Sequence, residues 1–118
     1  MPTPTNLNYH KKTNCLDLSF DDGLNFTLSA EYLRVFSPSA EVRGHGPGQE
    51  TLQYGKKYVK ITEIRPVGNY AVILVFDDNH DSGIYSWSYL YDICQNRDKN
   101  WQTYKEQLKN TNKKRSND

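Results

Sequence analysis

The longest apolar stretch in the chain is Tyr70–Phe76, with the sequence YAVILVF. It is far too short to span a membrane as a helix, which takes about 20 residues. Its side chains do not alternate between apolar and polar, so both faces of the segment must be covered by other parts of the protein. The stretch therefore predicts the central strand of a small sheet.

The composition describes an ordinary globular domain. The chain has 118 residues, of which 36% are hydrophobic and 25% charged, with a net charge of +1. This balance gives no reason to expect nucleic acid or a membrane as partner. The first residues lack the apolar core of a signal peptide, and Cys15 and Cys94 form no CxxC pair. We therefore expect a cytoplasmic protein, without a disulfide scaffold or a cysteine-only metal cage.

Alternating apolar residues predict a β-hairpin in the first third of the chain. Its two strands are Leu16–Phe20 and Leu24–Leu28, joined by a short Asp/Gly turn. Ser29 follows as a candidate N-cap for a short helix over Ala30–Phe36. Pro38 should end this helix, because the residue before a proline disfavours the α conformation.

Weaker patterns predict the remaining elements. A third strand is expected over residues 59–64, with a shift of face near Glu63, and residues 65–69 (RPVGN) read as a turn. Apolar spacing favours a helix over Ile84–Cys94. On that helix Ile84, Trp87, Leu90 and Tyr91 would share the buried face, leaving Tyr85 and Tyr89 more exposed. A further helical stripe consists of Trp101, Tyr104 and Leu108.

Together these elements predict an α+β fold, in which a small antiparallel β-sheet is packed on one face by helices as a two-layer sandwich. Residues 1–13 are polar and lack periodicity, so we expect a flexible N-terminal arm. Residues 14–108 form the single domain. Residues 109–118 are polar and basic, which predicts a disordered tail.

The polar segment after Tyr70–Phe76 invites a metal-binding interpretation. Asp77, Asn79 and Asp81 alternate like the first three ligands of a calcium loop. Such a loop needs glycine at its sixth position and glutamate at its twelfth, where this chain has Ser82 and Ser88. The simpler interpretation is a polar turn, in which Asp81 or Ser82 caps the following helix.

Two histidines are the candidates for metal binding. His80 is the stronger, because imidazole titrates near neutrality and binds metals, although a lone turn histidine is more often a local hydrogen-bonding group. His45 lies in the glycine-rich segment 44–48, which lacks the ending of a phosphate-binding P-loop. Without a nucleophile motif, no catalytic residues are assigned. The candidate interaction surface comprises Arg43, His45, Asp78, Asp81, Tyr85 and Trp87.

Several segments together resemble a known family. They are the hairpin, residues 28–49 (LSAEYLRVFSPSAEVRGHGPGQ) and residues 61–91 (ITEIRPVGNYAVILVFDDNHDSGIYSWSYLY). This combination is similar to the DUF971 family, the gamma-butyrobetaine hydroxylase-like N-terminal domain, over roughly residues 14–95. Members of that family stand alone as short bacterial proteins. Others are fused to an iron- and 2-oxoglutarate-dependent hydroxylase barrel or to a P-loop ATPase of iron–sulfur cluster assembly.

The resemblance has implications for metal binding. In the hydroxylases the domain resembles a zinc module with three cysteines and one histidine, and these positions fall here on Ser37, Ser39, Val42 and His80. Serine is a poor zinc ligand and valine is none, so the family's zinc site is not expected. The hydroxylase barrel and the ATPase domain are absent from the matched residues, so neither activity carries over.

Three functional hypotheses follow. The first is a non-catalytic accessory or interaction domain, linked through a protein partner to iron–sulfur or other metal-protein maturation. The alternative is a small metal-binding protein or enzyme centred on His80. The weakest is nucleic-acid binding through the aromatics and the basic tail, which would weaken steeply with salt. The sequence leaves the partner, any cofactor or ligand, and the oligomeric state open.

Overall fold

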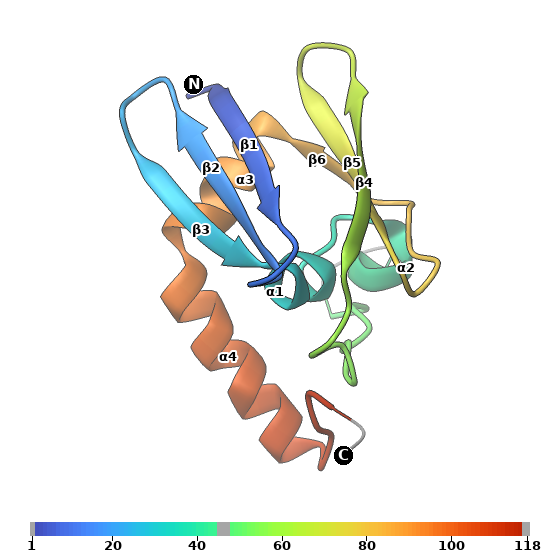
Figure 1. Ribbon diagram of the computed structural model, residues 1–118. Coiled ribbons are helices and arrows are strands. Elements are labelled where there is room, and N and C mark those ends of the chain that lie inside the picture. Colours follow the sequence, from blue (N-terminus) through green and yellow to red (C-terminus); the bar gives the residue numbers. More distant parts are fainter. Residues whose placement is uncertain (1, 45–47, 117–118) are drawn as a thin grey trace.

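The computed structural model describes residues 2–44 and 48–116, and Figure 1 shows their arrangement. These residues form two antiparallel three-stranded sheets and four helices. The first sheet contains β1 (Pro4–His10), β2 (Cys15–Phe20) and β3 (Asn25–Ser29). The second contains β4 (Ile61–Val67), β5 (Ala71–Phe76) and β6 (Ile84–Ser86). The helices are α1 (Ala30–Val35), α2 (Ala40–Arg43), α3 (Trp87–Gln95) and α4 (Arg97–Asn110).

The predicted α+β class with antiparallel strands is confirmed, and the strands divide into two sheets where we expected one. The strand orders are β1-β2-β3 and β4-β5-β6, so β2 and β5 are the central strands. Buried side chains from both sheets, α1 and α3 form one continuous core. In Figure 1, α4 extends away from the sheets. In the described part of the chain, no helix is both long and apolar enough to cross a membrane.

The strongest sequence patterns are found as expected. The hairpin joins β2 and β3, and Leu16, Leu18 and Phe20 all point into the core. The apolar stretch forms β5, although Tyr70 is 56% exposed and lies in the preceding turn. α1 begins after Ser29, whose hydroxyl accepts a hydrogen bond from the Tyr32 amide at 3.0 Å.

Strand β4 shows one confirmed detail and one correction. Its pairing with β5 shifts between Ile61 and Glu63, where the sequence predicted a change of face. Residues 65–67, predicted to lie in a turn, continue the strand instead. Pro66 is compatible with that strand because β4 is at the sheet edge, where a missing N–H need not break a ladder.

The prediction of a flexible N-terminal arm is wrong for most of its length. Residues 4–10 form β1, which pairs with β2 from Pro4↔Phe20 to His10↔Cys15. Leu7 and Tyr9 are half-buried against the core. Most side chains of this edge strand are polar, so it has no clear apolar periodicity in the sequence. It pairs with β2 through backbone hydrogen bonds, which do not depend on side-chain type.

The tail prediction is also wrong as far as residue 116. Helix α4 reaches Asn110, and the segment after it folds back onto residues 55–57, as Figure 1 shows. The amides of Gly55 and Lys57 donate to the carbonyls of Lys114 and Arg115, each at 2.9 Å. This basic segment is ordered because backbone amides and a carboxylate elsewhere in the chain bind it. Composition alone does not reveal such partners.

The predicted helix over Ile84–Cys94 starts three residues later than expected. Residues 84–86 form β6, and Ser86 caps α3 by accepting from the Tyr89 amide at 3.2 Å. Asp81 and Ser82 therefore do not cap it. Because side chains alternate along a strand, Tyr85 points inward and is fully buried, while Ile84 is 50% exposed, which reverses the prediction.

A hydrogen-bonded link joins the first sheet to the start of the second. The Tyr9 hydroxyl donates to the Asn14 side-chain oxygen and accepts from the Ile61 amide at 3.3 Å. The Asn14 side-chain amide in turn donates to the Val59 carbonyl at 2.7 Å. Asn14 has a φ of 56°, a left-handed conformation that asparagine tolerates better than most residues. This link fixes β1 against the second sheet.

We predict that Tyr9→Phe lowers the free energy of unfolding by about 1 kcal/mol, because it removes the hydroxyl from this link. The Ile61 amide should also exchange with solvent faster, as measured by hydrogen–deuterium exchange. Tyr70→Phe is the matched control, since Tyr70 is exposed and should leave both quantities unchanged. Equal Ile61 exchange rates in the two variants would contradict the link.

Candidate functional site

The segment Asp77–His80 is a tight turn after β5. The Phe76 amide donates to the His80 carbonyl at 2.9 Å, and Asn79 adopts a left-handed φ of 67°. The Asp77 side chain accepts from the Lys60 amide at 3.0 Å, which ties the turn to the segment before β4. The segment is therefore a polar turn, as predicted, although Ser86 caps the following helix in place of Asp81 or Ser82.

The imidazole of His80 lies inside the protein, only 3% exposed. Its Nε2 is 2.8 Å from Ser37 Oγ and 3.4 Å from Ser39 Oγ. Its Nδ1 lies 3.4 Å from Glu41 Oε2 but has no partner with hydrogen-bond geometry. The nearby carboxylate favours the tautomer with the proton on Nδ1, so that Ser37 donates to Nε2. We call Ser37, Ser39 and His80 the Ser–His cluster.

His80 is held in its neutral form. Burial lowers its pKa below the ordinary value of 6.5, and the positive charge of Arg34 lowers it further. The negative charges of Glu41 and Asp78 act in the opposite direction without cancelling the shift. A neutral imidazole can accept a hydrogen bond from the Ser37 hydroxyl, whereas an imidazolium has no free nitrogen lone pair with which to accept it.

A charged network adjoins the turn on the side of α1. Arg34, only 6% exposed, donates from Nε to Asp78 at 2.9 Å and from a terminal nitrogen to Gln53 at 3.0 Å. Lys56 donates to the same Asp78 oxygen at 2.8 Å. Burial raises the pKa of Asp78, but the Lys56 hydrogen bond and the Arg34 charge outweigh it and hold the pKa below its usual range. Asp78 is thus ionised, and its carboxylate connects the turn to Arg34 and Lys56.

Gly83 is needed where the chain passes the Ser–His cluster. A Cβ at this position would lie 2.4 Å from Ser37 Oγ and 3.2 Å from the Pro38 ring. The requirement for glycine here comes from lack of space and not from an unusual backbone dihedral.

The structure brings together most of the positions that the resemblance assigned to zinc. Ser37 and Ser39 both contact His80. Val42 follows them on α2 and is buried. Two hydroxyls and one imidazole are not a zinc donor set, which requires thiolate, imidazole or carboxylate ligands. Across the described residues, no three His, Cys, Asp or Glu side chains gather as a metal site needs. The residues present therefore do not fit the family's zinc.

The order Ser37–His80–Glu41 has the connectivity of a hydrolase triad. A nucleophile, however, must reach its substrate. Ser37 is fully buried, and neither Ser37 nor His80 lines the pocket between α1, α2 and α4. The arrangement is therefore a structural tie between the end of α1 and the turn after β5.

The predicted interaction surface is only partly accessible. Arg43 is exposed and lies over the Tyr89 ring, 5.8 Å from its centroid, and Asp81 is exposed in the turn. Trp87 is half-buried and donates to the Asn69 carbonyl at 2.7 Å. Tyr85 cannot contact a partner, because it is fully buried and its hydroxyl donates to Leu33 at 2.6 Å. His45 lies outside the described residues.

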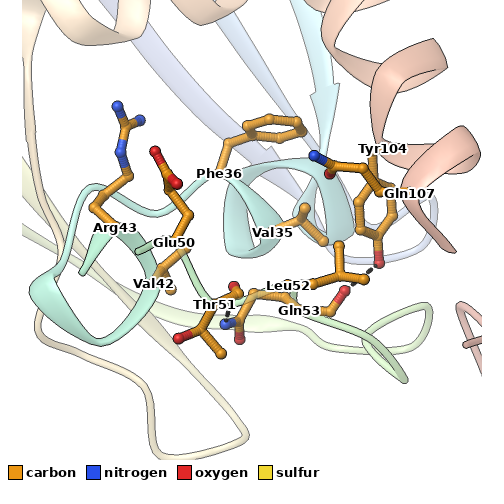
Figure 2. A pocket seen from close by; sticks show the side chains of 10 residues that line it. All are labelled: Val35, Phe36, Val42, Arg43, Glu50, Thr51, Leu52, Gln53, Tyr104 and Gln107. Atoms are coloured by element: carbon orange, nitrogen blue, oxygen red, sulfur yellow. Dashed lines mark hydrogen bonds between the residues drawn. The ribbon is translucent and has the colours of Figure 1, made fainter. Parts of the chain in front are cut away.

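A pocket that the sequence does not predict lies between α1, α2, the segment 50–53 and α4. It encloses about 360 Å³, and Figure 2 shows the side chains around it. Its apolar lining consists of Val35, Phe36, Val42, Leu52 and Tyr104, and its polar lining of Arg43, Glu50, Thr51, Gln53 and Gln107. We call it the α2–α4 pocket. The sequence pointed to Arg43 of the predicted interaction surface and Tyr104 of the helical stripe, but not to the pocket, because four separate segments build it.

One wall of the α2–α4 pocket is held by a hydrogen bond across the chain. The Tyr104 hydroxyl donates to the Gln53 carbonyl at 2.8 Å, as drawn in Figure 2. The Gln53 side chain meanwhile receives a hydrogen bond from Arg34. The pocket wall and the Ser–His cluster are thus connected through the Arg34–Asp78 network.

The fold and these two features define a small α+β domain with a buried Ser–His cluster and an open mixed pocket. A family model described as gamma-butyrobetaine hydroxylase-like, N-terminal matches residues 7–91. The chain belongs to this family. No curated protein matches it.

Solved structures support the assignment. A solution NMR structure is 42% identical with a TM-score of 0.86, covering 100% of this chain and 93% of that chain. A second NMR structure is 50% identical with a TM-score of 0.84, over 98% and 86% of the two chains. A crystal structure from Acidithiobacillus ferrooxidans, of a DUF971-family protein with unknown function, is 33% identical with a TM-score of 0.62. That match covers 75% of this chain and 88% of the other.

We predict that His80→Gln lowers the free energy of unfolding at pH 7.5 by about 1–3 kcal/mol, because Ser37 loses its buried partner. The pH dependence should change as well. With its folded pKa lowered, His80 binds fewer protons in the folded state than in the unfolded state as pH falls from about 6.5 toward the folded pKa. The wild type should therefore lose stability as pH falls through this range, by at most about 1.4 kcal/mol per pH unit, and His80→Gln should not.

Urea unfolding at pH 7.5 and pH 5.5 measures both effects. His10→Gln is the control, since His10 is exposed on β1 and bonded to Asp17 at 2.8 Å. The same acid dependence in the wild type and in His80→Gln would contradict the assignment of a neutral buried imidazole.

Proposed function

We propose that this protein is a non-catalytic interaction domain that binds a protein partner through the α2–α4 pocket. The single observation that supports this best is the combination of an apolar lining with Arg43 and Glu50 at one end. Its volume is at the lower end of binding pockets, which range over roughly 300–1,000 Å³. An apolar side chain of a partner would fill it, and the two charges would orient the surrounding polar contacts.

Binding is better supported than turnover by where the reactive groups lie. The nucleophile-like Ser37 and the imidazole of His80 are sealed inside the core. The α2–α4 pocket offers one guanidinium, one carboxylate, amides and hydroxyls, which can hold a ligand in place. Among the described lining residues there is no histidine or thiol beside these groups, so those residues do not form an acid–base pair of the usual kind.

The partner class that we infer is a protein of iron–sulfur or other metal-protein maturation. The support is the resemblance to domains fused to metal-dependent hydroxylases and to an iron–sulfur assembly ATPase, which is an argument by analogy. We infer that the protein binds this partner in the cytoplasm. That compartment would keep thiols reduced, in keeping with the free Cys15 and Cys94.

We predict that Leu52→Asp and Arg43→Glu each reduce partner capture at least tenfold, because they place a charge in the lining or invert one at its end. Quantitative affinity purification from native cells, followed by crosslinking of the captured protein, measures this. Lys12→Glu is the matched control for the charge change, since Lys12 is exposed in the turn after β1. Unchanged capture by both pocket variants, with crosslinks elsewhere, would refute the pocket as the binding site.

A second candidate function, metal binding at His80, rests on its unpartnered Nδ1 3.4 Å from Glu41. This pair alone is a weak site, because the Glu41 side chain is 71% exposed and the groups hydrogen-bonded to the other ring nitrogen are the hydroxyls of Ser37 and Ser39. We expect untagged protein to contain clearly less than one zinc ion per chain in elemental analysis. A stoichiometric metal that survives chelator in the wild type, and is absent from His80→Gln, would replace our proposal with this one.

A further inference from the structure

The acidic side chain of Glu31 is almost completely enclosed. It lies in the first turn of α1 and is 4% exposed. Both carboxylate oxygens accept hydrogen bonds from Arg115, one from Nε at 2.8 Å and the other from a terminal nitrogen at 2.7 Å. This is the fork geometry in which a guanidinium, but not an ammonium, pairs with a carboxylate.

An aromatic ring completes the surroundings of the guanidinium. The Arg115 Cζ atom lies 5.2 Å from the centroid of the Trp101 ring, within the range of a cation–π contact. Trp101 is on α4 and packs edge-on against Tyr32 of α1, with centroids 6.0 Å apart. The acid and the ring are therefore positioned by two packed helices, independently of the arginine that contacts them.

Arg115 lies on the segment that follows α4, the last described part of the chain. Residues 111–116 follow α4, and two backbone hydrogen bonds to Gly55 and Lys57 hold them against the 55–57 segment. The Arg115 side chain remains 40% exposed, in contrast to the enclosed Glu31. A pocket of about 320 Å³ lies beside it, lined by Glu31, Tyr32, Trp101 and Arg97 among others. A second guanidinium could reach the site if the tail left it.

We propose that Glu31 and Trp101 form a guanidinium-binding site that the chain's own Arg115 occupies. When the tail is displaced, the site takes the arginine side chain of a peptide ligand. This goes beyond the proposed function, because none of its residues lines the α2–α4 pocket. A failure here would leave partner binding at that pocket untouched.

Chemical rescue of full-length Arg115→Ala by methylguanidinium tests the site. Removing the side chain leaves Glu31 buried without its partner, so the variant should melt below the wild type. At about 20 mM, methylguanidinium should raise its melting temperature by about 2 °C or more in a saturable manner, as expected for a ligand of the folded state. The Trp101 indole resonance should shift in NMR over the same concentration range, whereas the wild type should respond in neither measurement.

Two matched comparisons make the result specific. Methylammonium carries the same charge without the fork and should not rescue Arg115→Ala. The double variant Glu31→Gln, Arg115→Ala should not respond to methylguanidinium, because the carboxylate is gone. If Arg115→Ala does not fold, Arg115→Lys replaces it in the same titration. Equal rescue by methylammonium, or no rescue by methylguanidinium, would overturn the proposal.

Discussion

Helix α1 lies in the middle of the molecule with all six of its residues buried, and two of those residues are charged. Burying an unpaired charge is costly, so Glu31 and Arg34 must find partners of opposite charge. Arg115 supplies one and Asp78 the other. These two ion pairs therefore help to hold the C-terminal segment and the turn after β5 against α1.

The carbonyl groups around α1 impose a second requirement, and tyrosine hydroxyls satisfy it. A short helix leaves its last carbonyls without intrahelical partners. Tyr85 donates to the Leu33 carbonyl and Tyr89 to the Phe36 carbonyl, while Tyr32 of α1 donates to the Ile93 carbonyl. These bonds connect α1 to β6 and α3, which explains why tyrosines that look like a surface patch in the sequence lie largely inside.

The Ser–His cluster completes the same frame at the end of α1. Where the resemblance places three thiolates and a histidine, this chain has the Ser37 hydroxyl, which lies close to Gly83 and is hydrogen-bonded to the His80 imidazole. Hydrogen bonds within a close-packed site can join two segments as a metal would, provided that the imidazole stays neutral. Because the cluster is enclosed, we propose binding in the α2–α4 pocket and at the guanidinium-binding site of Glu31 and Trp101, and not at the cluster.

The sequence alone determined the elements whose signal is local. The hairpin, the Ser29-capped helix, the central strand and the polar turn were all predictable, because periodicity and capping depend on residues close together in the chain. Residue type and position also singled out His80 as a residue of interest, and the resemblance singled out Ser37 and Ser39, which contact it.

The tertiary structure alone decided what depends on distant partners. Strand β1 and the ordered tail escaped prediction because backbone pairing and a salt bridge across 84 residues leave no periodic trace. The direction of Tyr85 was misjudged because a three-residue strand reverses the face that a helix would give. The α2–α4 pocket is built by four segments, so only the fold could bring its lining together. Such features arise from pairings between separated residues, which one-dimensional patterns do not record.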